Sequence, residues 1–276
     1  MSPPRPTFRR RKLARRLRRM REAAGMTIED AAVALDKHRN SLYRLEAGET
    51  RVDVHLARSM MDVYDHYDPT LIDDVRDTLK PRWWMKFGIR AMGYVDLETE
   101  AEEVRELALI YIPGLLQTQA YMRAIFESGT LKRAEQGTET EVRLIRQRRL
   151  TDDAEPLHLV ALVDESALRQ TIGGPEVMRE QLEHLVMVAE LSTVTLRVLP
   201  RSIGAHGGQG GAFTLLDFPD PEDRTMLYVG YGIGSIHIEE PGEVWRARIL
   251  FDHLLDRALG PEDSVSLIEQ IIAEDE

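Results

Sequence analysis

Apolar residues near the start of the chain recur at helical spacing. Leu13, Leu17 and Met20 lie four and then three positions apart, which places them on one face of a helix. Thr7 can cap the start of this helix, and Gly25 can end it. The pattern predicts an N-terminal amphipathic helix.

Two shorter helices are predicted next. Thr27, with Asp30 three residues later, forms an acidic variant of a capping box. The segment 36–38 interrupts the pattern, and residues 39–46 then read as a second short helix that Gly48 ends. Two short helices joined by a tight turn indicate a helix-turn-helix, in which the second helix enters the major groove of DNA.

Beyond residue 96, extended and helical patterns alternate along the chain. Apolar runs predict strands at residues 106–112, 157–163, 193–199, 211–218, 225–231 and 235–239. Helical spacing predicts helices at residues 117–127, 138–150, 175–190, 243–259 and 261–273. Because most of the strands cluster late, between Gly- and Pro-rich turns, we expect a mainly antiparallel sheet.

These patterns divide the chain into three segments. We predict a helix-turn-helix DNA-binding domain at residues 1–80, an aromatic linker at 81–96 and a C-terminal α+β regulatory or interaction domain at 97–276. The linker holds Trp83 and Trp84, with Phe87 and Tyr94 nearby. Such a cluster can stack on nucleic-acid bases, but we favour apolar packing of one domain on the next.

Charge separates the same segments. The chain has 36 Lys and Arg against 47 Asp and Glu, a formal net charge of −11. Its first 21 residues nevertheless hold ten basic residues and no acid, and through residue 58 there are 15 basic and 7 acidic residues. A dense basic segment favours contact with a polyanion, because neutralised phosphates release counterions. The simpler alternative is a solvated helix face.

Other classes of protein are disfavoured. The absence of cysteine excludes disulfides, a thiol nucleophile and Cys-based metal sites. No signal-peptide core or run of about 18 apolar residues occurs, so we expect a cytoplasmic protein without a membrane span. The glycine-rich segment 204–211 leads into a predicted strand, which favours a hairpin loop over a phosphate cradle. We therefore predict no enzyme activity, no metal site and no cofactor.

A family resemblance enters at the helix-turn-helix. The runs at residues 17–27 and 41–48 resemble the Xre/Cro-type (XRE family) repressor domain. The resemblance implies a five-helix domain, with its fourth helix at residues 53–64 and its fifth at 69–79. We expect DNA contacts from Thr27, Lys37, His38, Arg39, Asn40, Ser41, Tyr43 and Arg44. We expect weaker phosphate contacts from Arg10, Arg11, Arg15 and Arg51.

The turn departs from this family. Ile28 stands where the family usually has Gln, and Asp36-Lys37-His38 stands where it usually has Gly-Val-Ser. A Lys in place of the buried Val leaves two interpretations. Either the turn is rearranged, or the Lys37 stem packs while its ammonium reaches solvent.

The C-terminal segment carries a second resemblance. Motifs at residues 113–118 (PGLLQT), 162–168, 173–182, 194–200 and 213–216 look like those of one large actinobacterial family. In that family an Xre-type head is fused to a C-terminal domain of undefined role, as in the WhiJ-like regulators. The resemblance implies a transcriptional regulator and a small companion protein of the BldB-associated kind. The predicted fold class is α+β overall: an all-α five-helix repressor-type head followed by an α+β sensor or interaction domain.

The leading hypothesis is a sequence-specific regulator, such as a repressor, that binds double-stranded DNA as a homodimer. Its C-terminal domain would bind the small companion protein or a small-molecule effector. Candidate partner or ligand residues are Arg143, Arg146, Arg148 and Arg149, which either pair with acids of the chain itself or grip an acidic partner. The alternatives are a protein-interaction module with little operator specificity, such as a toxin/antitoxin-like component, and an enzyme in the C-terminal domain.

Overall fold

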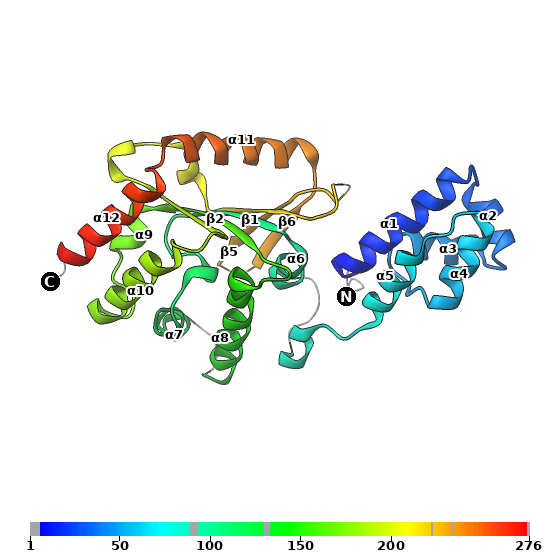
Figure 1. The fold of residues 1–276 in the computed structure, drawn as a ribbon, viewed down its shortest axis with the longest axis horizontal. Helices are drawn as coiled ribbons and strands as arrows, with labels where there is room; N and C mark the ends of the chain where they lie inside the picture. Colours follow the sequence, from blue (N-terminus) through cyan, green and yellow to red (C-terminus); the bar gives the residue numbers. More distant parts are fainter. Residues whose placement is uncertain (1–5, 89–92, 130–132, 222, 233, 275–276) are drawn as a thin grey trace. The chain divides into compact units, whose positions relative to one another are not determined.

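The computed structural model describes residues 6–88, 93–129, 133–221, 223–232 and 234–274. The predicted head and linker include residues 1–5 and 89–92, which lie outside the described residues. The chain divides into two compact units, residues 1–100 and 101–276 (Figure 1). Among the described helices, none is both long and apolar enough to cross a membrane.

The first unit begins with the predicted helical cluster. Over the described residues its helices are α1 (Phe8–Ala23), α2 (Ile28–Ala34), α3 (Arg39–Glu46), α4 (Val54–Val63) and α5 (Pro69–Leu79). A 3-10 turn, η1 (Trp83–Phe87), and helix α6 (Tyr94–Glu100) follow. The prediction of an all-α five-helix head is confirmed.

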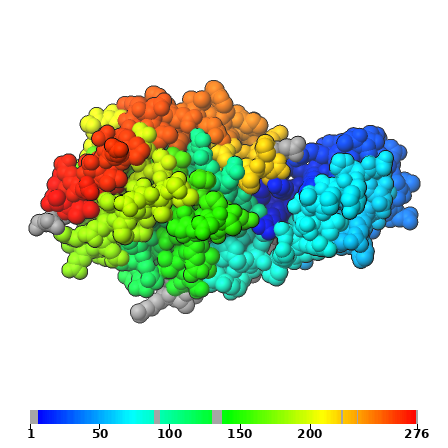
Figure 2. Space-filling view, viewed as in Figure 1, coloured from blue at the N-terminus to red at the C-terminus, as the bar shows by residue number. Residues whose placement is uncertain are grey.

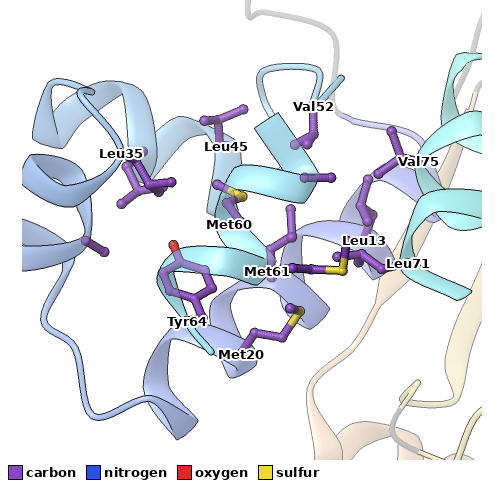
Figure 3. Close-up of a cluster of buried hydrophobic side chains, with 14 of the residues drawn as sticks. Leu13, Met20, Leu35, Leu45, Val52, Met60, Met61, Tyr64, Leu71 and Val75 are labelled. Carbon is purple, nitrogen blue, oxygen red and sulfur yellow. The ribbon is translucent and has the colours of Figure 1, made fainter. Parts of the chain in front are cut away.

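One apolar core holds these helices together. Figure 3 shows Leu13 of α1, Leu45 of α3, Met60 of α4 and Leu71 of α5 converging between the helices. The predicted apolar face of α1 is confirmed, since Leu13, Leu17 and Met20 are all buried. Full burial of an aliphatic side chain of this size contributes about 1.5–3 kcal/mol, so this core is the main source of the unit's stability.

The described part of the aromatic segment packs within the first unit. Trp84 is only 1% exposed, and the Trp83 ring meets it edge-on with 5.6 Å between ring centroids. Asp96 of α6 accepts a hydrogen bond from the backbone N–H of Phe8 at 3.0 Å, at the start of α1. Because Trp84 is buried, it offers no face on which a base could stack.

The second unit is built on one mixed sheet. Its described strands are β1 (Glu103–Ala108), β2 (His158–Asp164), β3 (Val194–Leu199), β4 (Phe213–Asp217), β5 (Met226–Tyr231) and β6 (Gly234–Ile238). Their order is β3-β2-β1-β4-β5-β6. Strands β1, β2 and β3 pair in parallel, whereas β1–β4, β4–β5 and β5–β6 are antiparallel. The α+β class is confirmed, with antiparallel pairs in the majority among the described strands.

Helices cover both faces of this sheet (Figure 1). Helix α11 (Pro241–Arg257) covers one face, where its Phe251 and Leu254 pack on Leu107, Leu162 and Leu215 of the strands. The other face carries α7 (Gln119–Ser128), α8 (Arg133–Gln147) and α10 (Pro175–Val188). The short helix α9 (Glu165–Arg169) follows β2, and α12 (Pro261–Glu274), red in Figure 2, packs beside α10 and β3.

Two sequence predictions in this unit are wrong in detail. The strand expected at 106–112 ends at Ala108, because the chain turns out of the sheet and the N–H of Ile112 bonds the Tyr121 hydroxyl at 3.3 Å. The segment 204–211 is not a hairpin loop, since β3 and β4 are not neighbours in the sheet. It packs closely instead: a Cβ on Gly208 would lie 2.7 Å from Leu254 Cδ1.

Candidate nucleic-acid interface

The first helix of the predicted helix-turn-helix has a defined start and end. Thr27 Oγ1 accepts the N–H of Asp30 at 3.2 Å and donates to its carboxylate at 2.6 Å, which confirms the predicted cap of α2. At the other end, the N–H of Asp36 bonds Val33 O at 3.1 Å and that of Lys37 bonds Ala32 O at 2.8 Å. This pair of bonds is the Schellman motif that ends many helices.

The turn is therefore regular despite its unusual sequence. Asp36 occupies the left-handed position of the motif, with φ at +54°, where glycine is the usual residue. Lys37 and His38 are exposed, and the His38 ring accepts the N–H of Asn40 at 3.2 Å to cap α3. Lys37 is exposed, so its side chain does not fill the core position that Val usually holds in the resembled family.

Helix α3 presents one apolar and one polar face. Leu42 and Leu45 lie in the core of the unit. The exposed residues of this helix are Arg39, Asn40, Ser41, Tyr43 and Arg44. Tyr43 is 62% exposed, so its aromatic ring faces solvent and does not pack in the core. The structure thus brings five of the predicted DNA-contact residues onto one outward face, with Lys37 and His38 just before it.

A buried ion pair fixes the orientation of α3. Arg21 of α1 donates from Nε to Glu46 Oε1 at 2.7 Å and from Nη2 to Glu46 Oε2 at 2.9 Å. Its Nη1 donates to Met26 O at 2.8 Å. The two side chains are only 10% and 6% exposed, and the bond to Glu46 raises the pKa of Arg21. Bidentate geometry makes this pair a rigid joint between α1, the loop after it and the end of α3.

The arginines on the outward face of α3 have weaker partners. Arg39 pairs with Glu29 of α2, and both side chains are more than half exposed. Arg44 Nε lies 4.0 Å from Glu49 Oε2. Exposed pairs of this kind are worth about 0–1 kcal/mol, so both guanidinium groups can exchange a carboxylate for a phosphate or a base at low cost.

Arg10 and Arg51 form a second basic feature of the first unit. Burial, with a smaller contribution from the charge of Arg51, lowers the pKa of Arg10. Arg10 Nε is buried without a hydrogen-bond partner among the described residues. Two neighbouring cations destabilise each other, and an anion placed between them would relieve that repulsion. The pair is suited to a DNA phosphate.

The other predicted phosphate contacts, Arg11 and Arg15, both lie against an aromatic ring. Their guanidinium carbons are 5.7 and 6.0 Å from the centre of the Phe8 ring. Stacking of this kind holds a guanidinium in place while it keeps its charge.

Much of the remaining basic charge on α1 is neutralised inside the unit. Arg16 pairs with Asp68 and Asp74, Arg9 Nε lies 2.6 Å from Glu100 Oε1, and Arg18 pairs with Glu22 at 2.8 Å. Sequence patterns did not indicate the ion pairs of Arg16 and Arg9. Their acidic partners are distant in the chain, since they lie in α5, just before α5 and in α6. The basic run is thus partly structural rather than one continuous polyanion surface.

The candidate arginines of the second unit do not share one environment. Arg143 donates to Gln117 Oε1 and lies over the Phe126 ring, 4.9 Å from its centre. Arg149 Nη2 donates to Ala101 O at 2.9 Å. Arg146 is half-buried on α8, and Arg148 is exposed just beyond it. Arg143 and Arg149 therefore each secure a different part of the fold.

One pairing in the second unit carried no signal in the sequence. His206, from the loop before β4, is buried with Nε2 3.5 Å from Asp164 Oδ2 at the end of β2. Neither ring nitrogen has a hydrogen-bond partner among the described residues. Within those residues, no three His, Asp or Glu side chains converge in a way that could hold a metal ion.

Models of known families match the N-terminal and the C-terminal part of the chain. Residues 12–75 match the family model described as a helix-turn-helix domain, which spans α2 and α3. Residues 92–270, well over half of the chain, match the model described as a domain of unknown function, DUF5753. No curated protein and no solved structure matches the chain. The helix-turn-helix match indicates a DNA-binding regulator.

Proposed function

The chain belongs to the DUF5753 family and carries a helix-turn-helix domain ahead of that region, and from this premise we propose that it is a sequence-specific transcriptional regulator. The observation that carries the proposal is the exposed face of α3. Arg39, Asn40 and Arg44 stand on a helix whose other face is fixed by Leu42, Leu45 and the Arg21–Glu46 pair.

The side chains on this face suit base edges in the major groove. An arginine can donate two hydrogen bonds to guanine, and an asparagine can do the same with adenine. Arg10 and Arg51, together with Arg11, Arg15 and Lys37, would contact phosphates and set the register of the helix. Thr27 at the start of α2 and His38 at the start of α3 would contribute polar contacts beside them.

We propose a homodimer on a two-fold symmetric operator. A single eight-residue helix reads only a few base pairs. Two copies would place their α3 helices in major grooves about one helical turn apart, roughly 34–36 Å. A repressor of the XRE family would act in this way.

The second unit would control the first. The order of its motifs resembles the WhiJ-like regulators of actinobacteria, so we propose that it binds a small companion protein or an effector. Binding changes DNA affinity only if the bound state differs in its preference for DNA. Arg146 and Arg148 of the α8 region would take part in docking an acidic partner.

The direct test is selection of DNA by the full-length chain from a pool of random duplexes, followed by a mobility shift with the enriched site. We expect one enriched, two-fold symmetric motif. As a control, Arg76→Gln on α5 changes an exposed arginine that, among the described residues, pairs with Asp73, and it should select the same motif. A pool that stays random after selection would refute sequence-specific regulation and favour a protein-interaction module with little operator specificity.

A further inference from the structure

A large pocket lies in the second unit, at the carboxyl end of β1. Its volume is about 990 Å³, at the upper end of the roughly 300–1,000 Å³ typical of small-molecule sites. Asp164 at the end of β2, Ala212 before β4 and Tyr231 at the end of β5 contribute to its lining. In this sheet the chain leaves β1 towards β2 on one side, while β4 lies on the other. The pocket lies outside the end of the sheet where β1 and β2 finish and the antiparallel β4 begins.

One wall of the pocket is held rigidly by glutamine side chains. Gln117 Nε2 donates to Ile112 O at 2.6 Å, and Gln147 Nε2 donates to Gly114 O at 3.2 Å and Gln117 O at 2.8 Å. Gln181 donates to Leu116 O at 2.8 Å and accepts the N–H of Thr118 at 2.7 Å. The PGLLQT segment is therefore preformed, and a ligand would not have to order it on binding.

The lining of the pocket also combines aromatic rings with bare backbone. Tyr111 and Tyr231 are about half exposed although both line the pocket. Gly211 and Gly232 also line it, and a Cβ added to either would meet nothing within 4 Å. Tyrosine faces beside side-chain-free backbone leave room for a flat ring system, which can stack on the rings and approach the backbone closely.

Arg143 places a positive charge in the lining of the pocket. Its guanidinium lines the pocket, and it is held between Gln117 Oε1 and the Phe126 ring. Gly114 also lines the pocket beside Arg143, whose Nε lies 3.5 Å from the position that a Cβ of residue 114 would take. A planar guanidinium held in a fixed orientation is suited to bidentate binding of an acidic group.

We propose that this pocket is the effector site and takes a planar aromatic molecule bearing an acidic group, with the acid on Arg143 and the rings against Tyr111 and Tyr231. The regulatory meaning of this site rests on the proposed function of the chain, whereas the binding chemistry does not. A concave pocket with a rigid wall favours a small molecule over a segment of a partner protein.

The test compares an anionic probe with its neutral analogue on the full-length chain without DNA. The probes are 1-anilinonaphthalene-8-sulfonate and N-phenyl-1-naphthylamine, which share their rings and differ in the sulfonate. Fluorescence titration should show saturable binding of both at one site per chain. Arg143→Gln should weaken the sulfonate probe about tenfold or more and the neutral probe less than about twofold. Retained binding of the neutral probe also shows that the variant still has its pocket.

Matched variants locate the site. Tyr231→Ala should weaken both probes several-fold, because each loses a stacking surface. Two control variants change exposed residues outside the pocket: Arg123→Gln on α7 and Trp245→Ala on α11. Both should leave the two titrations unchanged. Two results would overturn the proposal. One is an equal loss of affinity for both probes in Arg143→Gln, and the other is a loss of affinity in Trp245→Ala but none in Tyr231→Ala.

A DNA arm separates this inference from the proposed function. If the probes bind as expected but the chain selects no DNA motif, the regulatory role fails and the site stands. If the chain selects its motif, but a partner peptide binds at this surface and neither probe shows saturable binding, the regulator stands and the aromatic-acid site is refuted.

Discussion

Asp36 holds a backbone conformation that residues with side chains rarely adopt. Its φ of +54° lies in the left-handed region, and the Schellman bonds at the end of α2 require that conformation. Glycine adopts it without the steric cost of a Cβ, whereas alanine pays that cost and lacks the local polar bonding available to aspartate. The helix-turn-helix thus keeps its turn at some expense in stability.

Replacement of Asp36 should therefore change stability in opposite directions. We expect Asp36→Gly to be the more stable variant and Asp36→Ala the less stable, with a gap of about 1 kcal/mol in the free energy of unfolding. Urea unfolding followed by circular dichroism measures the gap. An alanine variant as stable as the glycine variant would contradict the assigned conformation.

Asp96 is a buried carboxyl group at the start of α1. It is 2% exposed, and burial raises its pKa, although the N–H of Phe8 and the charge of Arg82 act in the opposite direction. The folded state therefore retains this proton at a pH where the unfolded chain has released it. Asp96 thus contributes stability at low pH, and that contribution is lost as the pH rises through its raised pKa.

Asp96→Asn removes this titration while it keeps an oxygen that can accept the Phe8 N–H. We expect the free energy of unfolding of the variant, minus that of the wild type, to increase as the pH rises from about 4 upward. Urea unfolding at a series of pH values measures this difference. Parallel stability curves for the two proteins would show that the carboxyl group keeps its ordinary pKa in the fold.

At the scale of elements, the segment between β1 and α7 depends on side chains from other elements as well as on its own short 3-10 turn. Gln181 of α10 is completely buried and bonds both Leu116 O and the N–H of Thr118. Leu116 ends a short 3-10 turn (Gly114–Leu116) and Thr118 is the N-cap of α7, so both groups lie at the ends of short elements. A single side chain therefore connects α10 to the loop that forms the pocket wall.

Gln181→Leu should leave two buried backbone groups unpaired. Each such group costs about 1–3 kcal/mol, so we expect a loss of roughly 2–6 kcal/mol in the free energy of unfolding. Gln119→Leu, at an exposed position at the start of α7, should change it by less than about 0.5 kcal/mol. Thermal unfolding of both variants measures the contrast. Equal, small effects would show that the loop does not need Gln181.

Local patterns predicted most elements, and contacts between distant residues explain the failures. Periodicity and capping residues indicated the helices of the head, because those signals lie within a few residues of each other. The predicted end of the first strand, at residue 112, was wrong because the Tyr121 hydroxyl accepts the N–H of Ile112 outside the sheet. The arginines of α1 looked available because the acids that bind Arg16 and Arg9 come from much later in the chain. The outward residues of α3 were expected from the resemblance to the Xre/Cro-type domain.

At the scale of the whole molecule, the basic charge lies in a chain that is acidic overall. The formal net charge of −11 gives no general attraction for DNA, so binding must come from the basic surface of the first unit. Within that surface we propose that Arg10 and Arg51 contact phosphate, because neither has to give up a carboxylate among the described residues.

Arg10→Gln combined with Arg51→Gln should reduce the salt dependence of DNA binding. Each lost phosphate contact removes about 0.9 from the slope of log K against log salt, so we expect a slope smaller by about 2. Fluorescence anisotropy with a duplex of random sequence, at several salt concentrations, measures the slope. Arg76→Gln is the control and should keep the wild-type slope. An unchanged slope in the double variant would remove Arg10 and Arg51 from the interface.

The most direct test is the specificity ratio, the affinity for the selected site divided by that for random duplex at the same salt concentration. Arg39→Ala combined with Arg44→Ala should lower this ratio at least about tenfold, because a good base contact discriminates by about 1–3 kcal/mol. The Arg10 and Arg51 double variant should weaken both affinities and leave the ratio nearly unchanged. If the ratio survives intact in the Arg39 and Arg44 double variant, α3 does not read the operator through these arginines.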